Sequence, residues 1–100
     1  MKPVLLHDEA RAELDDAAGW YERKKLGLGG EFRAAVEEAI ARIRQNPQLG
    51  PRFASTRSRY RLVRCFPYVV FYVECESVIR MMAIAHGSRR PGYWRRRTVE

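Results

Sequence analysis

One stretch near the C-terminus decides the fold: residues 78–86 read VIRMMAIAH, and residues 87–97 read GSRRPGYWRRR. A mostly apolar run that is halted by Gly and Ser is typical of a strand buried on both faces. We therefore expect residues 78–86 in the middle of a sheet. An arginine-rich tail then leaves the core.

The positive charge lies in the second half of the chain. Residues 1–50 carry eight Lys or Arg against nine Asp or Glu, whereas residues 51–100 carry eleven Arg, no Lys and three Glu, so that −1 and +8 give the net charge of +7. Arginine favours planar, bidentate recognition of phosphates and carboxylates. The asymmetry indicates an acidic partner, either nucleic acid or protein, with a basic surface kept for solubility as the alternative.

The length of 100 residues predicts a single domain over residues 1–100. Neither a secretory leader nor a membrane-spanning run is visible, so we expect a soluble, cytoplasmic protein with no membrane partner. Cys65 and Cys75 flank a predicted hairpin, too far apart to bridge, and are expected as small core or sheet residues. No zinc-binding, P-loop, HExxH or GxSxG pattern is present, and we expect no metal and no cofactor.

The pattern along the chain predicts the order strand, helix, helix, strand, strand, strand. A short strand at 4–6 precedes a helix capped by Asp8, and a second helix follows the glycines at 27–30 and ends at Asn46-Pro47. Residues 47–58 form a loop, and residues 59–64, 68–73 and 78–86 have the composition of strands. This order predicts an α+β domain in which a helical hairpin covers one face of an antiparallel sheet.

Candidate site residues come from the second half of the chain. We expect Arg59 and Arg61 on the exposed face of the sheet, converging with Arg89 and Arg90 to bind a phosphodiester backbone or acidic groups. Tyr93 and Trp94 are interleaved with arginines, among them Arg95 and Arg96. They either stack on unpaired bases or pack back onto the domain.

His86 stands where the last predicted strand ends. Its imidazole suits a general base acting on a 2′-hydroxyl, with Arg89 stabilising the phosphorane, or it has a purely structural role.

The motifs taken together resemble the RelE/ParE superfamily, the toxins of bacterial type II toxin–antitoxin modules. The resemblance covers nearly the whole chain and rests on the segments AEL (12–14), WYE (20–22), YRL (60–62), FPYVVFY (66–72) and AH (85–86), with Arg89, Pro91, Tyr93 and Trp94.

The resemblance implies one of two activities. A ParE-like toxin poisons DNA gyrase, whereas a RelE-like toxin cleaves messenger RNA on the ribosome. Cleavage would engage Arg61, Arg64, His86, Arg89 and Tyr93. We favour the ParE-like activity, because Val69 follows Tyr68 where the prototype of the ribonuclease branch has an arginine.

The resemblance also implies a cognate antitoxin that wraps the toxin. We expect that antitoxin to be acidic and to bury apolar anchors, with Trp20 among the apolar side chains left exposed by the helices. The binding residues are expected to be Arg59, Arg61, Arg89, Arg90, Tyr93, Trp94, Arg95 and Arg96. A homologue that binds its antitoxin but has lost toxicity is a further alternative.

Overall fold

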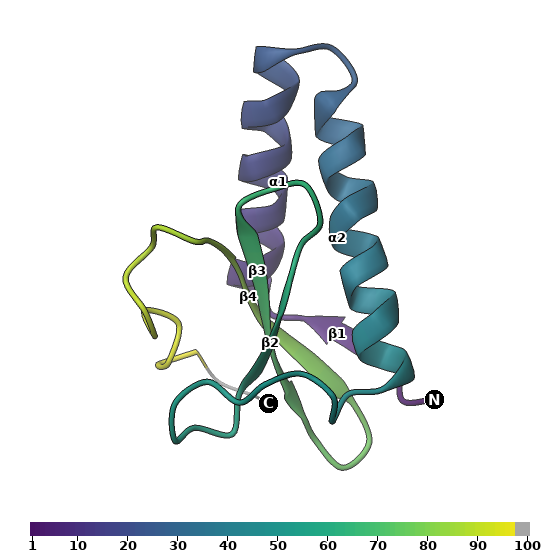
Figure 1. Ribbon diagram of the computed structural model, residues 1–100, viewed down its shortest axis with the longest axis vertical. Coiled ribbons are helices and arrows are strands. Elements are labelled where there is room, and N and C mark those ends of the chain that lie inside the picture. The colour runs from purple at the N-terminus through teal and green to yellow at the C-terminus, as the bar shows by residue number, and fades with distance from the viewer. Residues whose placement is uncertain (98–100) are drawn as a thin grey trace.

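A four-stranded sheet is the layer to which every other element attaches in the computed structural model, which describes residues 1–97 (Figure 1). The elements follow the predicted order. They are β1 (Val4–Leu6), α1 (Asp8–Lys24), α2 (Leu28–Gln45), β2 (Arg59–Leu62), β3 (Tyr68–Glu74) and β4 (Ile79–His86).

The strands are arranged β1-β4-β3-β2, which places β4 inside the sheet as its apolar sequence predicts. The expectation of an antiparallel sheet needs correction, because β1 pairs with β4 in parallel, with Val4 opposite Ile79 and Leu6 opposite Met81. A parallel pair needs a long connection between its strands. The two helices and the β2–β3 hairpin supply that connection, so the sheet is mixed.

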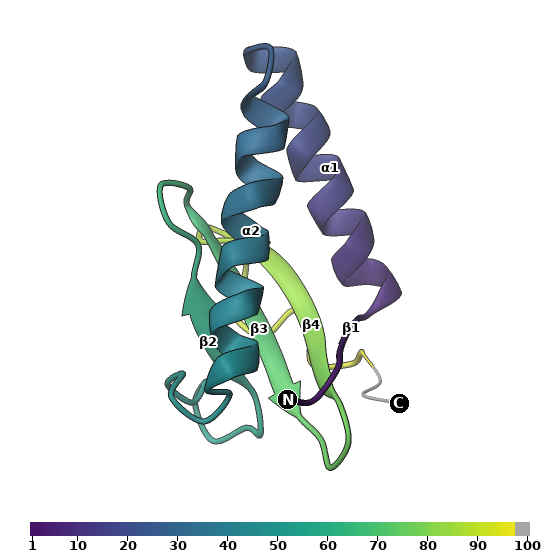
Figure 2. The same cartoon turned by 90° about the vertical axis from the view of Figure 1, so that its right-hand side faces the viewer.

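The helical hairpin covers one face of the sheet, and the C-terminal segment crosses the other (Figure 2). Val70, Tyr72 and Ile84 belong to the core beneath the helices, whereas Ala83 and Trp94 belong to a second apolar cluster. The two sets alternate along β3 and β4 because successive side chains of a strand point to opposite faces, and a bulge lies where Phe71 pairs with Ala83 but Tyr72 pairs with Met81. Strand β4 is therefore buried on both faces, as predicted.

The two helices approach closely at Gly29. A Cβ at this position would lie 2.6 Å from the carbonyl oxygen of Ala18 on α1, so only glycine fits without a shift of the backbone. The link between the helices turns at Gly27, where φ is +88°. The Glu22 carboxylate accepts the N–H groups of Gly27 and Gly29, both at 2.9 Å, and thereby satisfies the start of α2.

The start of α1 differs from the prediction. His7, rather than Asp8, is the N-cap: its Nδ1 accepts the N–H of Glu9 at 3.1 Å, and Asp8 is already in the first turn. The N–H of His7 is also held by the carbonyl of Met81 at 2.9 Å, so the same residue ends the ladder between β1 and β4.

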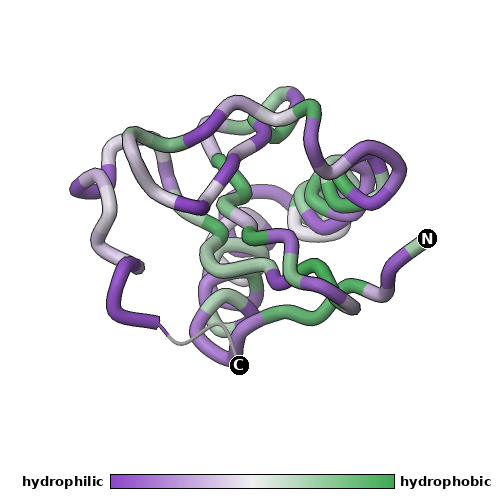
Figure 3. The backbone as a smooth tube through the Cα atoms, turned by 90° about the horizontal axis from the view of Figure 1, so that it is seen from below, coloured by the Kyte–Doolittle hydropathy of each residue, from purple (hydrophilic) through white to green (hydrophobic). Residues whose placement is uncertain are grey.

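Figure 3 shows that the segment leading toward the C-terminus is strongly hydrophilic. Cys65 and Cys75 are both free, as predicted, but Cys65 is exposed in the β2–β3 turn rather than packed in the sheet. Within residues 1–97, none of the helices has the length and apolar character needed to span a bilayer.

Candidate interaction surface around the C-terminal segment

The segment after β4 folds back across the sheet through a series of tight turns. The N–H of Gly87 donates to Pro67 O at 2.8 Å, and the N–H of Arg89 donates to His86 O at 2.9 Å. Further turns follow through residues 90–97. We call residues 87–97 the C-terminal segment.

One carboxylate on α1 anchors this segment. Glu13 accepts two hydrogen bonds from Arg97, at 3.0 and 2.8 Å, and a further bond from the Tyr93 hydroxyl. Its Oε1 also accepts the backbone N–H of Ile84 at 2.9 Å, while Arg97 donates to Met82 O at 2.9 Å. Because β1 pairs with β4 only as far as Met81, these side chains satisfy the part of the β4 edge that has no neighbouring strand.

The electrostatics of the cluster follow from this geometry. Burial by itself raises the pKa of Glu13, but hydrogen bonds from Arg97, Tyr93 and the Ile84 N–H outweigh it and hold that pKa below its ordinary value. Burial and the bond to Glu13 raise the pKa of Tyr93 well above that of a free tyrosine. The bond to Glu13 also raises the pKa of Arg97. The cluster thus holds an ionised carboxylate, a neutral phenol and a charged guanidinium.

Trp94 is the apolar counterpart of this anchor. Only 3% of it is exposed, and its ring centroid lies 4.8 Å from Phe71 and 5.5 Å from Phe53. Of the two alternatives raised for Trp94, the structure has the indole packed on its own domain. Tyr93 is also engaged, since its hydroxyl is bonded to Glu13 and the Arg89 guanidinium stacks 3.9 Å from its ring centroid.

Four arginines of the segment remain exposed: Arg89, Arg90, Arg95 and Arg96. Among residues 1–97 the ion pairs involve other cations, so none of these four guanidinium groups is neutralised by a carboxylate of the chain. The C-terminal segment therefore presents uncompensated positive charge on a rigidly anchored support. An acidic partner would be attracted to it.

Arg59 and Arg61 do not converge with Arg89 and Arg90. In an antiparallel pair, opposed residues point to the same side of the sheet. Arg59 is opposite Tyr72 and Arg61 is opposite Val70, so both lie on the face that carries the helices. Arg59 is further held by Gly50 O at 2.7 Å. The predicted concave face lined by all four arginines is therefore not formed.

The residues proposed for RNA cleavage are only partly brought together. His86 and Arg89 line one hollow together with Tyr68 and the carboxylates Glu13 and Asp16. Burial raises the pKa of Tyr68, helped by the charges of Tyr21 and Glu13. Arg61 is absent from the residues that line this hollow. Arg64 lies in the β2–β3 turn, 3.9 Å from Glu38 of α2.

The hydrogen bonding of His86 bears on its chemistry. Its Nδ1 accepts the N–H of Ser88 at 3.0 Å and lies 2.8 Å from the Ser88 hydroxyl. A neutral imidazole that accepts at Nδ1 carries its proton on Nε2. In this arrangement Nε2 is a donor rather than a base. The ring also packs on Tyr68 with centroids 5.2 Å apart, at the end of β4.

Sequence reasoning missed Glu13, Arg97 and Phe53. A signal for Glu13 was available: positions 10, 13, 14 and 17 share one side of a helix, and the other three of these residues are apolar. A carboxylate at that position faces the sheet and needs a buried donor. Arg97 could not have been distinguished from its neighbours Arg95 and Arg96 by sequence alone.

Comparisons with known proteins concern the family and the fold. A family model described as ParE toxin of the type II toxin–antitoxin system parDE matches residues 4–91. Among solved structures, a chain of one described as the chromosomal ParDE toxin–antitoxin system from P. aeruginosa superposes with a TM-score of 0.64 at 18% identity, covering 86% of this chain and 96% of that chain. At that identity the likeness concerns the fold. No curated protein matches the chain. Because the family match spans most of the sequence, the chain belongs to the ParE toxin family of type II toxin–antitoxin systems.

Proposed function

We propose that this protein inhibits growth by binding DNA gyrase in the cytoplasm and that a cognate acidic antitoxin neutralises it. The proposal rests on membership of the ParE family together with one observation: four exposed arginines on the anchored C-terminal segment have no carboxylate partner within residues 1–97. Such a surface favours binding to an acidic protein surface.

The hydrogen bonds around the candidate catalytic residues support a binding protein over a nuclease. Nδ1 of His86 is engaged by Ser88, and the Tyr93 hydroxyl is engaged by Glu13. General base catalysis needs a group that can take a proton from the attacking hydroxyl, and these two groups are committed elsewhere.

Ribosome-dependent cleavage of messenger RNA is the second candidate. It is favoured by one observation, the hollow in which His86, Arg89 and Tyr68 lie together. Arginine beside a potential proton donor is suited to a developing phosphorane. Under this alternative, Arg89→Ala would abolish cleavage of messages and leave DNA supercoiling untouched.

The deciding experiment induces the protein and follows two readouts in parallel. We expect purified protein to block supercoiling by gyrase and to stabilise cleaved plasmid, while primer extension shows intact messages. The double variant Arg89→Glu with Arg90→Glu should lose this inhibition, and Arg42→Glu, an exposed position on α2, should retain it. Cuts within translated codons with normal supercoiling would overturn the proposal, as would a failure of strong induction to slow growth.

A further inference from the structure

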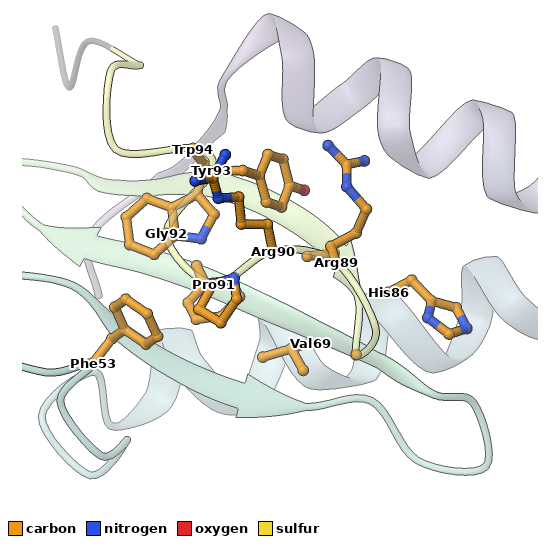
Figure 4. A pocket seen from close by; sticks show the side chains of 12 residues that line it. Phe53, Val69, His86, Arg89, Arg90, Pro91, Gly92, Tyr93 and Trp94 are labelled. Atoms are coloured by element: carbon orange, nitrogen blue, oxygen red, sulfur yellow. The ribbon is translucent and has the colours of Figure 1, made fainter.

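A cavity of about 200 Å³ lies between the C-terminal segment and the open face of the sheet (Figure 4). Its walls are mainly apolar and are formed by Phe53, Val69, Phe71, Ala85, Pro91 and Trp94. In another protein a cavity of roughly 150 Å³ lined by apolar side chains accommodates benzene. This cavity can therefore admit one large apolar side chain, such as a phenylalanine or leucine.

The cavity exists because β4 presents only small side chains on this face. Val69 is paired with Ala85, and Phe71 is paired with Ala83, so each cross-strand pair combines a larger residue with an alanine. Trp94 covers the Ala83 end within the second apolar cluster. The Ala85 end is left unfilled and lines the cavity.

The rim of the cavity is positively charged. Arg89 and Arg90 line it, and no Asp or Glu belongs to its lining. Four other hollows on the described surface each include at least one carboxylate. An apolar anchor in this cavity would therefore lie beside Arg90 and beside Arg89, whose guanidinium stacks on Tyr93 and also borders the hollow with Glu13 and Asp16. Guanidinium groups pair best with carboxylates.

The wall also contains a polar group without a partner. The Nε1 of Trp94 is buried and has no hydrogen-bond acceptor among residues 1–97. In Figure 4 this nitrogen is on the edge of the indole that faces Arg90 and Pro91, both of which line the cavity. The nitrogen itself is shielded, so an occupant of the cavity meets the indole ring rather than its N–H.

An apolar track leads to the cavity from the edge of the sheet. Leu62 on the edge strand β2 is 65% exposed and is paired with Val69, which is paired in turn with Ala85. An extended peptide that crosses the strands can cover Leu62 before its anchor enters the cavity. Exposed apolar surface that leads into a charged pocket is characteristic of a protein-binding site.

We propose that this cavity is the anchor pocket for an acidic peptide segment of the antitoxin, which inserts one large apolar side chain and places neighbouring carboxylates on Arg89 and Arg90. The inference rests on the proposed function in taking the partner to be an antitoxin. Charge complementarity favours a peptide of this composition over an apolar one.

The test uses the full-length chain labelled with ¹⁵N and a capped probe peptide, acetyl-Asp-Phe-Glu-amide. The two tryptophans give two indole N–H resonances, and Trp20 on α1 is an internal control because it does not line the cavity. We expect saturable movement of the Trp94 indole resonance, because this ring lines the cavity, with Trp20 unmoved. Acetyl-Asn-Phe-Gln-amide and acetyl-Asp-Ala-Glu-amide should each bind at least tenfold more weakly.

Two variants test separately how the charge and the shape of the cavity contribute to peptide binding. Arg90→Glu should weaken binding of the acidic peptide at least tenfold, whereas Arg42→Glu should change it less than twofold. Ala85→Val, which narrows the cavity, should weaken the Phe peptide more than the Ala peptide, with spectra of both variants remaining dispersed. The inference would be overturned if the neutral peptide bound equally well or if the Trp94 resonance did not move. It would also be overturned if a single-stranded oligonucleotide displaced the peptide and itself shifted the Trp94 resonance.

The result of the peptide-binding test does not depend on whether the protein inhibits gyrase. If supercoiling is unaffected while the peptide shifts Trp94, the gyrase proposal fails and the pocket stands. If gyrase is inhibited while no acidic peptide reaches Trp94, the pocket assignment fails and the gyrase proposal stands.

Discussion

Glu13 and Arg97 are separated by 84 positions in the sequence and are joined in the structure by two hydrogen bonds of 3.0 and 2.8 Å. Their side chains are 16% and 10% exposed, so the pair is largely removed from water. It ties the C-terminal segment to α1 and to the edge of β4. Together with the packing of Trp94, this pair fixes the position of the exposed arginines.

Glu13→Ala should destabilise the protein by about 3 kcal/mol, because removing one partner of a buried ion pair leaves the other charge uncompensated. Equilibrium unfolding in urea measures the change. Asp15→Ala is the matched control on the same helix. Its ion pair with Arg33 is about half exposed on both sides, and its loss should cost less than about 1 kcal/mol. Equal costs for the two variants would show that Glu13 does not anchor the segment.

The stabilisation from Glu13 should depend on pH. Its pKa is lower in the folded protein than the ordinary value of 4.5, so the unfolded chain takes up the proton first as pH falls. The difference in unfolding free energy between the native protein and Glu13→Gln should be constant at neutral pH. It should begin to shrink as pH approaches 4.5 and disappear once pH falls below the folded pKa. Urea unfolding between pH 7 and pH 3 tests this, and a difference that grows toward acid pH would contradict it.

Tyr93→Phe should cost about 1.5–3 kcal/mol of stability, since a hydrogen bond to a buried carboxylate is lost. Growth inhibition should persist at a temperature where the variant is folded. If the hydroxyl instead acts in RNA cleavage, inhibition would vanish while the unfolding midpoint stays near that of the native protein. A growth assay with the unfolding curve of the same variant distinguishes the two roles.

Truncation of the two tryptophans should differ widely in its cost to stability. Trp94→Ala removes a ring that is 3% exposed and packed on Phe53 and Phe71, and should cost about 3–5 kcal/mol. Trp20 is 49% exposed, and Trp20→Ala should cost less than about 1 kcal/mol. Chemical denaturation followed by circular dichroism, which does not depend on tryptophan fluorescence, compares them. A stable Trp94→Ala protein would mean that the segment is not packed as described.

Adjacent glycines of α2 should behave differently when replaced by alanine. Gly29→Ala places a Cβ against the carbonyl oxygen of Ala18 and should destabilise the helical hairpin by about 1–3 kcal/mol. A Cβ at Gly30 meets nothing within 4 Å, so Gly30→Ala should stabilise by about 0.5–1 kcal/mol through helix propensity. Thermal unfolding of both variants provides the comparison, and a shift of the same sign in both would refute the close approach at Gly29.

The sequence by itself determined the elements and their order. The apolar run at 78–86 predicted an inner strand, because a strand carries apolar residues on both sides when both of its faces are covered. Strand β4 is covered on both faces and lies inside the sheet. Helical periodicity on both sides of the glycines at 27–30 predicted the helical hairpin, because both signals depend only on neighbouring residues in the sequence. The excess of positive charge in the second half of the chain could likewise be counted without knowledge of the fold.

Only the tertiary structure decided which arginines share a surface. Side chains alternate between the faces of a strand, so the β2–β3 register sends Arg59 and Arg61 to the helix side and away from Arg89 and Arg90. The parallel pairing of β1, the burial of Glu13 and the inward packing of Trp94 likewise depend on contacts between distant parts of the chain. Local sequence patterns can place Glu13 on the buried side of its helix, but they cannot name its partner, because the free energy of such a contact arises only when the two distant segments meet.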